Sequence, residues 1–291
     1  MVDSPTVALL GTGIMGAGMA RNILAAGLPL RVWNRSADKA RPLAEHGAEI
    51  AATPADAVRG ADVVVTMVGD GPQVADLLDQ AADGLRSGQV LLQTTTAGID
   101  QDALIDRAEA RGLLFVDAPV MGTRQPAESG QLVILAAGAP AAREIAQPVL
   151  DAVGRATHWL SEDPRSLAGS RLKLVVNSWV LAITAATGEA VALAEGLGVD
   201  PQAFLDAVAG GPLDSGYLQA KAKAILAGDW TPNFSVDNAA KDAGLIVAAA
   251  ESVGLTLDVA AAAEARMRRA SDAGHGDDDM AAAYLASRPT V

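Results

Sequence analysis

A glycine-rich loop near the start of the chain places the strongest constraint on its fold. The loop, Gly11-Thr12-Gly13-Ile14-Met15-Gly16, has the spacing G-x-G-x-x-G and follows the apolar segment Thr6–Leu10. The residues after it have the composition of a helix, so the loop is expected to join a strand to a helix. In such a turn Gly11 permits a tight bend, Gly13 lets the backbone approach a pyrophosphate, and Gly16 lets helix and strand pack closely. The helix N-terminus adds free N–H groups and partial positive charge, so the sequence predicts a dinucleotide-binding site here.

Short apolar segments alternate with helical segments through the first half of the chain. The predicted strands are Thr6–Leu10, Leu30–Trp33, Ala48–Ala51, Val63–Val68, Val90–Gln93, Leu113–Val116, Leu132–Ala136 and Thr157–Leu160. Strands at this spacing, with helices between them, are typical of βαβ units and a parallel sheet. Continuous runs such as Val63-Val64-Val65 fit strands that are covered on both faces.

The pattern changes near Ser161-Glu162-Asp163-Pro164, after which no strand is predicted. Lys173–Leu197 is expected to form one long helix, and alanine-rich helical segments follow it. The sequence therefore predicts an α/β protein with two domains. Residues 1–163 are expected to form a doubly wound sheet domain of the Rossmann type, and residues 164–291 an all-helical domain that binds substrate and dimerises.

Charge and composition argue against several classes of protein. The chain has 22 Lys and Arg against 35 Asp and Glu, a formal net charge of −13. Such a chain repels phosphate backbones, and its basic cluster of Arg266, Arg268 and Arg269 is expected to be a solvated helix face, so no nucleic-acid partner is predicted. The absence of cysteine removes disulfides and metal–thiolate sites, and no metal site is predicted.

The same survey predicts no membrane partner. The longest uncharged stretch, between Lys173 and Glu189, is shorter than the ~18–20 residues that a bilayer requires. The first residues lack the basic and apolar regions of a signal peptide. A soluble, cytoplasmic protein is therefore expected.

The end of the second predicted strand indicates which cofactor is used. NAD enzymes usually have Asp or Glu at this point to bind the ribose 2′-hydroxyl. Here the sequence is Trp33-Asn34-Arg35-Ser36, with no acid at the tip. Arg35 can form a forked contact with a 2′-phosphate, and Asn34 and Ser36 can add hydrogen bonds. The sequence therefore predicts NADP(H) over NAD(H). The simpler alternative is that Ser36 caps the next helix and Arg35 is solvated.

Four blocks of sequence carry a further signal. They are Gly11–Gly16 with Met19-Ala20-Arg21-Asn22, Asp117-Ala118-Pro119-Val120-Met121-Gly122, Gly169-Ser170-Arg171-Leu172-Lys173 with Asn177, and Phe234 followed by Lys241-Asp242. Together they resemble the β-hydroxyacid dehydrogenase family, which includes 3-hydroxyisobutyrate dehydrogenase. Gln125–Leu132 is most similar to its glyoxylate/succinic semialdehyde reductase branch. The resemblance implies hydride transfer between a nicotinamide and the carbonyl of a small aldehyde, keto acid or β-hydroxy acid.

The resemblance also implies roles for residues of both predicted domains. Lys173 matches the family's catalytic lysine, which would give a proton to the developing alkoxide. Asn177, one helical turn later, would orient Lys173 or bond the substrate, with a helix–helix contact as the alternative. Lys241 and Asp242 match a pair that approaches the cofactor and substrate, with an exposed helix pair as the alternative. Further contacts with cofactor or substrate are implied for Met67, Val68, Thr95 and Phe234.

The substrate motif departs from the family pattern. The family usually has Ser where this chain has Met121, and Gly or Ser where it has Thr123. That Ser helps hold the substrate carboxylate, and Met cannot donate a hydrogen bond. A less polar pocket around Met121, Gly122 and Thr123 is therefore expected, and apolar carbonyl compounds or imines become candidate substrates.

Two alternatives to a carbonyl reductase stay open. An NADPH-dependent imine reductase shares this two-domain plan, although such enzymes commonly have Asp or Tyr in place of Lys173. A non-catalytic NADPH-binding protein would bind the cofactor without turnover. Under each reading a homodimer through the helical domain is expected, because the long helix has apolar residues on several faces. Examples are Val180, Leu181, Val191 and Leu193.

Overall fold

The computed structural model describes residues 4–287. The chain divides into two compact units, Met1–Lys173 and Leu174–Val291, whereas the sequence predicts a boundary after residue 163. The difference comes from the start of helix α8 (Ala168–Gly196). The backbone N–H of Ser170, in its first turn, donates to Asp117 of the sheet at 2.8 Å, which ties this turn to the first unit.

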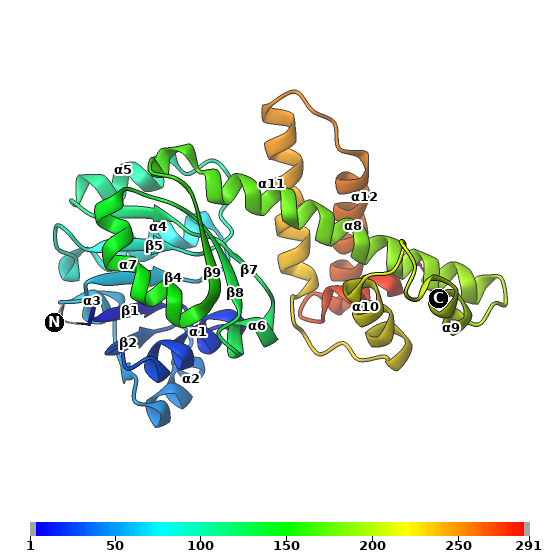
Figure 1. Cartoon of the computed structure of the whole chain (residues 1–291), viewed down its shortest axis with the longest axis horizontal. Helices are drawn as coiled ribbons and strands as arrows, with labels where there is room; N and C mark the ends of the chain where they lie inside the picture. Colours follow the sequence, from blue (N-terminus) through cyan, green and yellow to red (C-terminus); the bar gives the residue numbers. More distant parts are fainter. Residues whose placement is uncertain (1–3, 288–291) are drawn as a thin grey trace. The chain divides into compact units, whose positions relative to one another are not determined.

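The first unit contains a nine-stranded sheet within the described residues (Figure 1). Its strands are β1 (Val7–Leu10), β2 (Leu30–Trp33), β3 (Glu49–Ile50), β4 (Val63–Thr66), β5 (Val90–Gln93), β6 (Leu114–Asp117), β7 (Val120–Met121), β8 (Leu132–Ala137) and β9 (Gly154–Ser161). The first six are parallel and run in the order β3-β2-β1-β4-β5-β6. This is the strand order of a doubly wound nucleotide-binding sheet, so the predicted fold class is confirmed. Strand β8 is antiparallel to β6 and β7, and β9 is parallel to β8.

Helices cover both faces of this sheet (Figure 1). They are α1 (Ile14–Ala25), α2 (Ala37–Ala40), α3 (Pro54–Val58), α4 (Gly71–Gln80), α5 (Asp102–Ala110), α6 (Arg124–Glu128) and α7 (Pro140–Val153). Alternate residues of β1 point to opposite faces. Val7 and Leu9 join an apolar cluster with residues of α1 and α7, whereas Ala8 and Leu10 join a second cluster with residues of α4 and α5. The central strands β1, β4 and β5 are therefore buried on both faces, as their continuous apolar runs predict.

The predicted strands are present, with some ends shifted. Leu30–Trp33 and Val90–Gln93 have the predicted bounds, whereas Val63–Val68 ends at Thr66 and the last strand begins at Gly154. Strand β7 is absent from the sequence prediction. It has two residues and pairs with β8, so no local alternation of apolar and polar residues marks it.

The second unit is helical. After α8 it contains α9 (Pro201–Val208), α10 (Gly216–Ala227), α11 (Val236–Ser252), α12 (Asp258–Ala270) and a 3-10 segment, Met280–Ser287. Val191, Leu205, Ile225 and Tyr284 are buried together in one apolar cluster. The predicted helix Lys173–Leu197 is confirmed, although it begins earlier, at Ala168.

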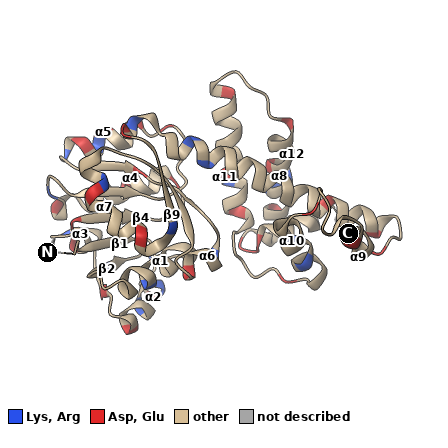
Figure 2. Cartoon of the chain, in the orientation of Figure 1, with Lys and Arg blue, Asp and Glu red and all other residues tan. Residues whose placement is uncertain are grey.

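The basic cluster near the end of the chain is smaller than the sequence suggests. Arg266 is buried and donates to Glu189 at 3.0 Å, so the prediction that it is solvated is wrong. Arg268 is exposed and pairs with Glu264 at 2.6 Å. Figure 2 shows acidic and basic residues on helices of both units.

One segment meets the length and composition criteria for a membrane span. It is Pro164–Gly196, with mean hydropathy 1.4 and 39% of that apolar window buried inside the structure. A core helix of a soluble protein meets the same criteria, so this observation is weak. The absence of a membrane partner stays a prediction.

Candidate active site

The glycine loop connects β1 to α1 and depends on glycine at two positions. Gly11 has φ +106°, and a Cβ there would overlap the carbonyl oxygen of Met67. A Cβ at Gly16 would overlap the carbonyl oxygen of Gly11. Gly13 differs, because a Cβ there would meet no atom within 4 Å. Gly11 and Gly16 are thus required by packing within the protein, and Gly13 faces open space.

The groups around this loop fit a dinucleotide phosphate. The Thr12 hydroxyl is buried, the residue being 2% exposed, and it has no hydrogen-bond partner among residues 4–287. Helix α1 begins after Gly13 with no side-chain cap among those residues. A buried hydroxyl without a partner costs stability, so an acceptor from a ligand would satisfy it. The free N–H groups of α1 would add to the binding of an anion.

The residues expected to bind the 2′-phosphate of the cofactor follow β2. The Asn34 side chain accepts from the Thr12 N–H at 2.9 Å and donates to the Ser36 carbonyl at 3.0 Å. Its amide therefore bridges the two loops, and the predicted hydrogen bond from Asn34 to the cofactor stays a prediction. Ser36 occupies the N-cap position of α2, but its side chain makes no capping hydrogen bond among the described residues. Arg35 and Ser36 are both exposed.

Met67, Val68 and Thr95 lie beyond the carboxyl ends of β4 and β5. The Met67 N–H donates to the Leu10 carbonyl at 2.9 Å, which places this loop beside the glycine loop. The buried Thr95 hydroxyl accepts from the Val68 N–H at 3.0 Å and donates to the Thr66 carbonyl at 3.3 Å. Because its one proton is used internally, Thr95 can meet a cofactor through its methyl group, its backbone or a remaining lone pair.

Lys173 lies in the second turn of α8 and is only 9% exposed. The first turn of this helix is bonded to the end of β6. Asp117 accepts from the Ser170 N–H at 2.8 Å and from the Ser170 hydroxyl at 2.6 Å. Asp117 and Ser170 lie in blocks that carry the family resemblance, but the sequence analysis assigns no role to either. The sequence does carry a signal for Asp117, because this acidic residue ends the apolar run of β6.

Burial raises the pKa of Asp117 to about 6, and hydrogen bonds from Ser170 and Gly169 oppose the shift. The folded protein thus binds this proton more tightly than the unfolded chain does. Its contribution to stability is present below pH 3.8 and is lost as the pH rises through about 6. Since each tenfold change in proton affinity is worth about 1.4 kcal/mol, the loss approaches ~3 kcal/mol. Urea unfolding should show Asp117→Asn gaining about this much relative to wild type between pH 4 and pH 7. A difference between the two proteins that is constant with pH would contradict the assignment.

A second cluster lies within the helical unit. The Asn177 amide donates to the Asp242 carboxylate at 2.6 Å, and the Lys241 ammonium lies 2.8 Å from the other Asp242 oxygen. Asp242 is 2% exposed, so the alternative of an exposed helix pair is wrong. A carboxylate only accepts, which directs the NH₂ group of Asn177 toward it and leaves the carbonyl oxygen facing away. The carbonyl oxygen of the Asn177 side chain thus stays available to accept a hydrogen bond.

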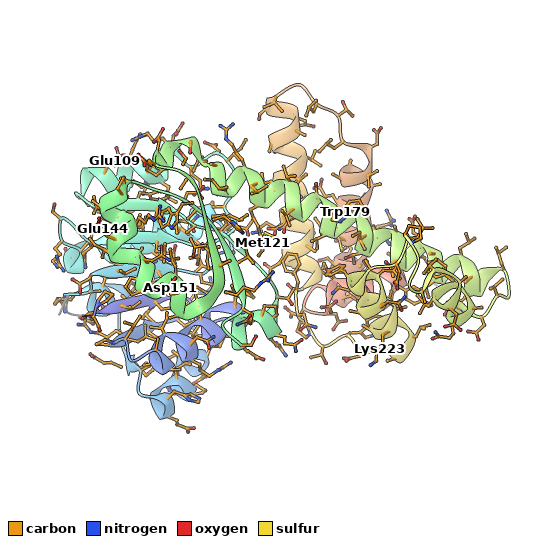
Figure 3. The ribbon with its side chains drawn as sticks, in the orientation of Figure 1. Glu109, Met121, Glu144, Asp151, Trp179 and Lys223 are labelled. Carbon is orange, nitrogen blue, oxygen red and sulfur yellow. The ribbon has the colours of Figure 1, made fainter. Side chains whose placement is uncertain are left out.

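The predicted substrate residues lie in two places. Met121 ends β7 and is half-buried, Gly122 follows with φ +137°, and Thr123 precedes α6 without capping it (Figure 3). Phe234, in the helical unit, is half-buried. Its carbonyl accepts from the Met280 N–H at 2.8 Å, and Asp279 holds the loop before it by accepting from the Asn233 N–H at 3.0 Å.

The structure therefore groups the predicted residues by unit. The glycine loop, Met67, Val68, Thr95 and the anchor of the Lys173 helix share the carboxyl edge of the parallel strands. Ligands of doubly wound sheets bind at this edge. In the helical unit Asn177 is hydrogen-bonded to Asp242, and Lys241 forms an ion pair with the same carboxylate.

Comparison with protein families assigns both units. Residues 6–161 match the NAD binding domain of 6-phosphogluconate dehydrogenase. Residues 168–286 match the family described as the NAD-binding domain of NADP-dependent 3-hydroxyisobutyrate dehydrogenase. Together these matches show a nicotinamide cofactor and an oxidoreductase.

Individual relatives agree with this assignment. Glyoxylate/succinic semialdehyde reductase 2, a chloroplastic protein of Arabidopsis thaliana, is 31% identical over 95% of this chain and 78% of its own length. The structure of 3-hydroxyisobutyrate dehydrogenase from Salmonella typhimurium has a TM-score of 0.88 and 30% identity, covering 96% of this chain and 99% of that one. An imine reductase from Pseudomonas sp. has a TM-score of 0.65 and 25% identity, covering 98% and 100%. The chain spans about half the length of several other curated relatives. The chain belongs to the β-hydroxyacid dehydrogenase family.

Proposed function

We propose that the protein is an NADPH-dependent reductase of small aldehydes or keto acids, with Lys173 as the proton donor. The observation that carries the proposal is a lysine 9% exposed on a helix whose first turn is bonded to the carboxyl edge of the sheet. The glycine loop lies at the same edge. When bound, the nicotinamide supplies a hydride. Lys173 holds a proton where an alkoxide would develop, and its ammonium gives that proton to the alkoxide.

Asn177 and Asp242 complete the proposed machinery in the helical unit. Asp242 fixes the Asn177 amide, and the carbonyl oxygen of Asn177 accepts from an ammonium or a substrate hydroxyl. Lys241 balances the charge of the buried Asp242 carboxylate. Because Asp242 is held from two sides, its proposed role is to orient Asn177.

The test of this function is NADPH consumption by the purified protein. Glyoxylate, succinic semialdehyde, apolar aldehydes and cyclic imines form the panel. Turnover of the small acids supports the proposal and makes Met121 a tolerated replacement. Turnover of cyclic imines alone would replace it with an imine reductase, which the fold of the Pseudomonas enzyme favours as second candidate. Cofactor binding with no turnover would indicate a non-catalytic NADPH-binding protein.

Arg35 is the proposed determinant of NADPH use. It is exposed directly after β2, where its guanidinium is free to turn toward a 2′-phosphate. Arg35→Ala should raise KM for NADPH by about 10–100-fold, since hydrogen bonds to charged groups are worth ~1.5–3 kcal/mol. KM for NADH should change little. Arg41→Ala is the matched control, because Arg41 is exposed nearby and already pairs with Asp38 at 2.5 Å. Equal KM values for NADH and NADPH in the wild type would contradict this assignment.

Helix α8 also supports the proposal of a homodimer through the helical unit. Leu181 and Val191, which the sequence suggested as partner contacts, are buried within the unit. Leu193, which the sequence also suggested, is exposed. Three further apolar residues on α8 or directly after it are exposed as well: Val175, Trp179 and Leu197. Trp179 is 68% exposed on α8 (Figure 3). Two of the intervals between them are one helical turn, which produces an apolar stripe.

Sedimentation tests the dimer. The wild type should sediment at about twice its 29.5 kDa chain mass, since a symmetric partner covers such a stripe. Trp179→Glu should shift the protein toward the monomer. Leu213→Glu is the control, because Leu213 is an equally exposed apolar residue outside α8. A monomeric wild type would exclude this interface.

A further inference from the structure

Four buried polar side chains form a continuous hydrogen-bond network in the first unit. The Ser170 hydroxyl donates to Asp117 at 2.6 Å, and Gln101 donates to the Ser170 oxygen at 2.9 Å. Gln93 donates to the Gln101 carbonyl oxygen at 3.1 Å. All four side chains are buried. We name this set the Asp117–Gln93 network.

The network has a single arrangement of donors and acceptors. Asp117, when ionised, only accepts, so Ser170 must donate to it and must accept from the NH₂ group of Gln101. The second proton of Gln101 goes to the Gly98 carbonyl at 2.7 Å, and the second proton of Gln93 to the Thr95 carbonyl at 3.0 Å. The Gln93 oxygen accepts from the Thr95 N–H at 2.6 Å. Every amide proton is used, and a fully satisfied buried network of this kind rigidifies its surroundings.

The network ends at two proposed functional residues. At one end Ser170 lies three positions before Lys173, in the first turn of α8. Gly169 fixes the same turn, because a Cβ there would overlap the Leu135 carbonyl oxygen of β8. At the other end Gln93 holds both backbone groups of Thr95.

Stability alone does not account for the network. Burial raises the pKa of Asp117 to about 6, so keeping its carboxylate ionised at neutral pH lowers the stability of the fold. The ionised carboxylate does set the direction of every bond in the network. Its benefit therefore lies in holding the connected residues in one arrangement.

We propose that the Asp117–Gln93 network is a positioning device that fixes the helical turn before Lys173 against the strand end that carries Thr95, with Ser170 as its key positioning residue. This rests on the proposed proton transfer by Lys173 and extends it. A reacting group displaced by about 1 Å loses on the order of 10²-fold in rate. Because its four side chains are buried, the network acts on kcat through the position of Lys173.

Ser170→Ala tests the proposal, because it removes the one hydroxyl that links Asp117 to Gln101. We expect kcat per folded molecule to fall by about 10–100-fold, with the Kd for NADPH nearly unchanged. The thermal midpoint should fall as well, because the buried Gln101 amide and Asp117 carboxylate each lose a hydrogen-bond partner. Gln101→Met, which breaks the network outside α8, should act in the same direction. Ser178→Ala is the matched control: it is the same change in the same helix, and the Ser178 hydroxyl bonds only the Val175 carbonyl of its own helix, at 2.7 Å. A purely structural role predicts a lower midpoint with kcat per folded molecule unchanged, and that result would overturn the proposal.

A second measurement does not require turnover. The rate at which acetic anhydride modifies Lys173, read by mass spectrometry of its peptide, should rise in Ser170→Ala and stay at the wild-type value in Ser178→Ala. Equal rates in all three proteins would overturn the proposal even if the wild type were inactive. An inactive wild type with altered Lys173 labelling would instead refute the proposed function and leave the positioning role supported.

Discussion

Lys173→Ala is expected to lower kcat by about 10²–10⁴-fold, the range typical for loss of a general acid. The alkoxide that develops during carbonyl reduction needs a proton, and the alanine variant has no group at this position to supply it. The glycine loop and Thr12 are untouched, so NADPH affinity should be nearly unchanged. Steady-state kinetics with NADPH and the best substrate of the panel, together with a direct titration of NADPH binding, would separate the two effects.

Two companion variants sharpen this result. Lys223→Ala removes an exposed lysine from α10 (Figure 3) and should leave kcat at the wild-type value. Lys173→Arg keeps a positive charge but does not release its proton near neutral pH, so it should recover little of the lost rate. If Lys173→Ala kept most of the wild-type kcat, the proton would have to come from another group.

Gly11→Ala and Gly13→Ala are expected to separate folding from cofactor binding within one loop. A Cβ at Gly11 would overlap a backbone carbonyl at a residue with φ +106°, so Gly11→Ala should lose about 3 kcal/mol or more of unfolding free energy. A Cβ at Gly13 meets no atom within 4 Å, and its φ of −69° suits alanine. Gly13→Ala should therefore fold normally and fail where the pyrophosphate must approach the backbone.

Thermal unfolding without cofactor and NADPH titration are the measurements. Gly13→Ala should keep the wild-type midpoint and raise the Kd for NADPH by about tenfold or more, since ~1.4 kcal/mol of lost contact is enough. Gly11→Ala should lower the midpoint before any cofactor is added. Wild-type affinity in Gly13→Ala would mean that the cofactor does not lie against this loop.

The sequence predicted the sheet well because its signals are local. Leu30–Trp33 and Val90–Gln93 are apolar runs of strand length, and each is followed by turn residues. The glycine loop is likewise recognised from the spacing of six consecutive residues, although the carbonyl that excludes a Cβ at Gly11 belongs to Met67. By contrast, β7 has two residues, and only its pairing with β8 makes it a strand.

The candidate site was predictable in its residue types and unpredictable in its contacts. Asn34 is predicted to add a hydrogen bond to the cofactor, and the structure adds that its amide joins two loops. Asp242 was assigned by resemblance, and the structure adds its bond to Asn177. Such contacts depend on which strand or helix lies beside which, and no short stretch of sequence records this.

The sequence by itself determined the doubly wound sheet, the position of the glycine loop and the switch to a helical second half. These follow from periodicity and turn chemistry over a few residues. Only the tertiary structure decided that Asp117 would hold the turn before Lys173, across 53 residues, and that Asp242 would hold Asn177, across 65. The physical reason is that a buried polar group must find a partner wherever the fold brings one, and that choice is made when the elements pack together.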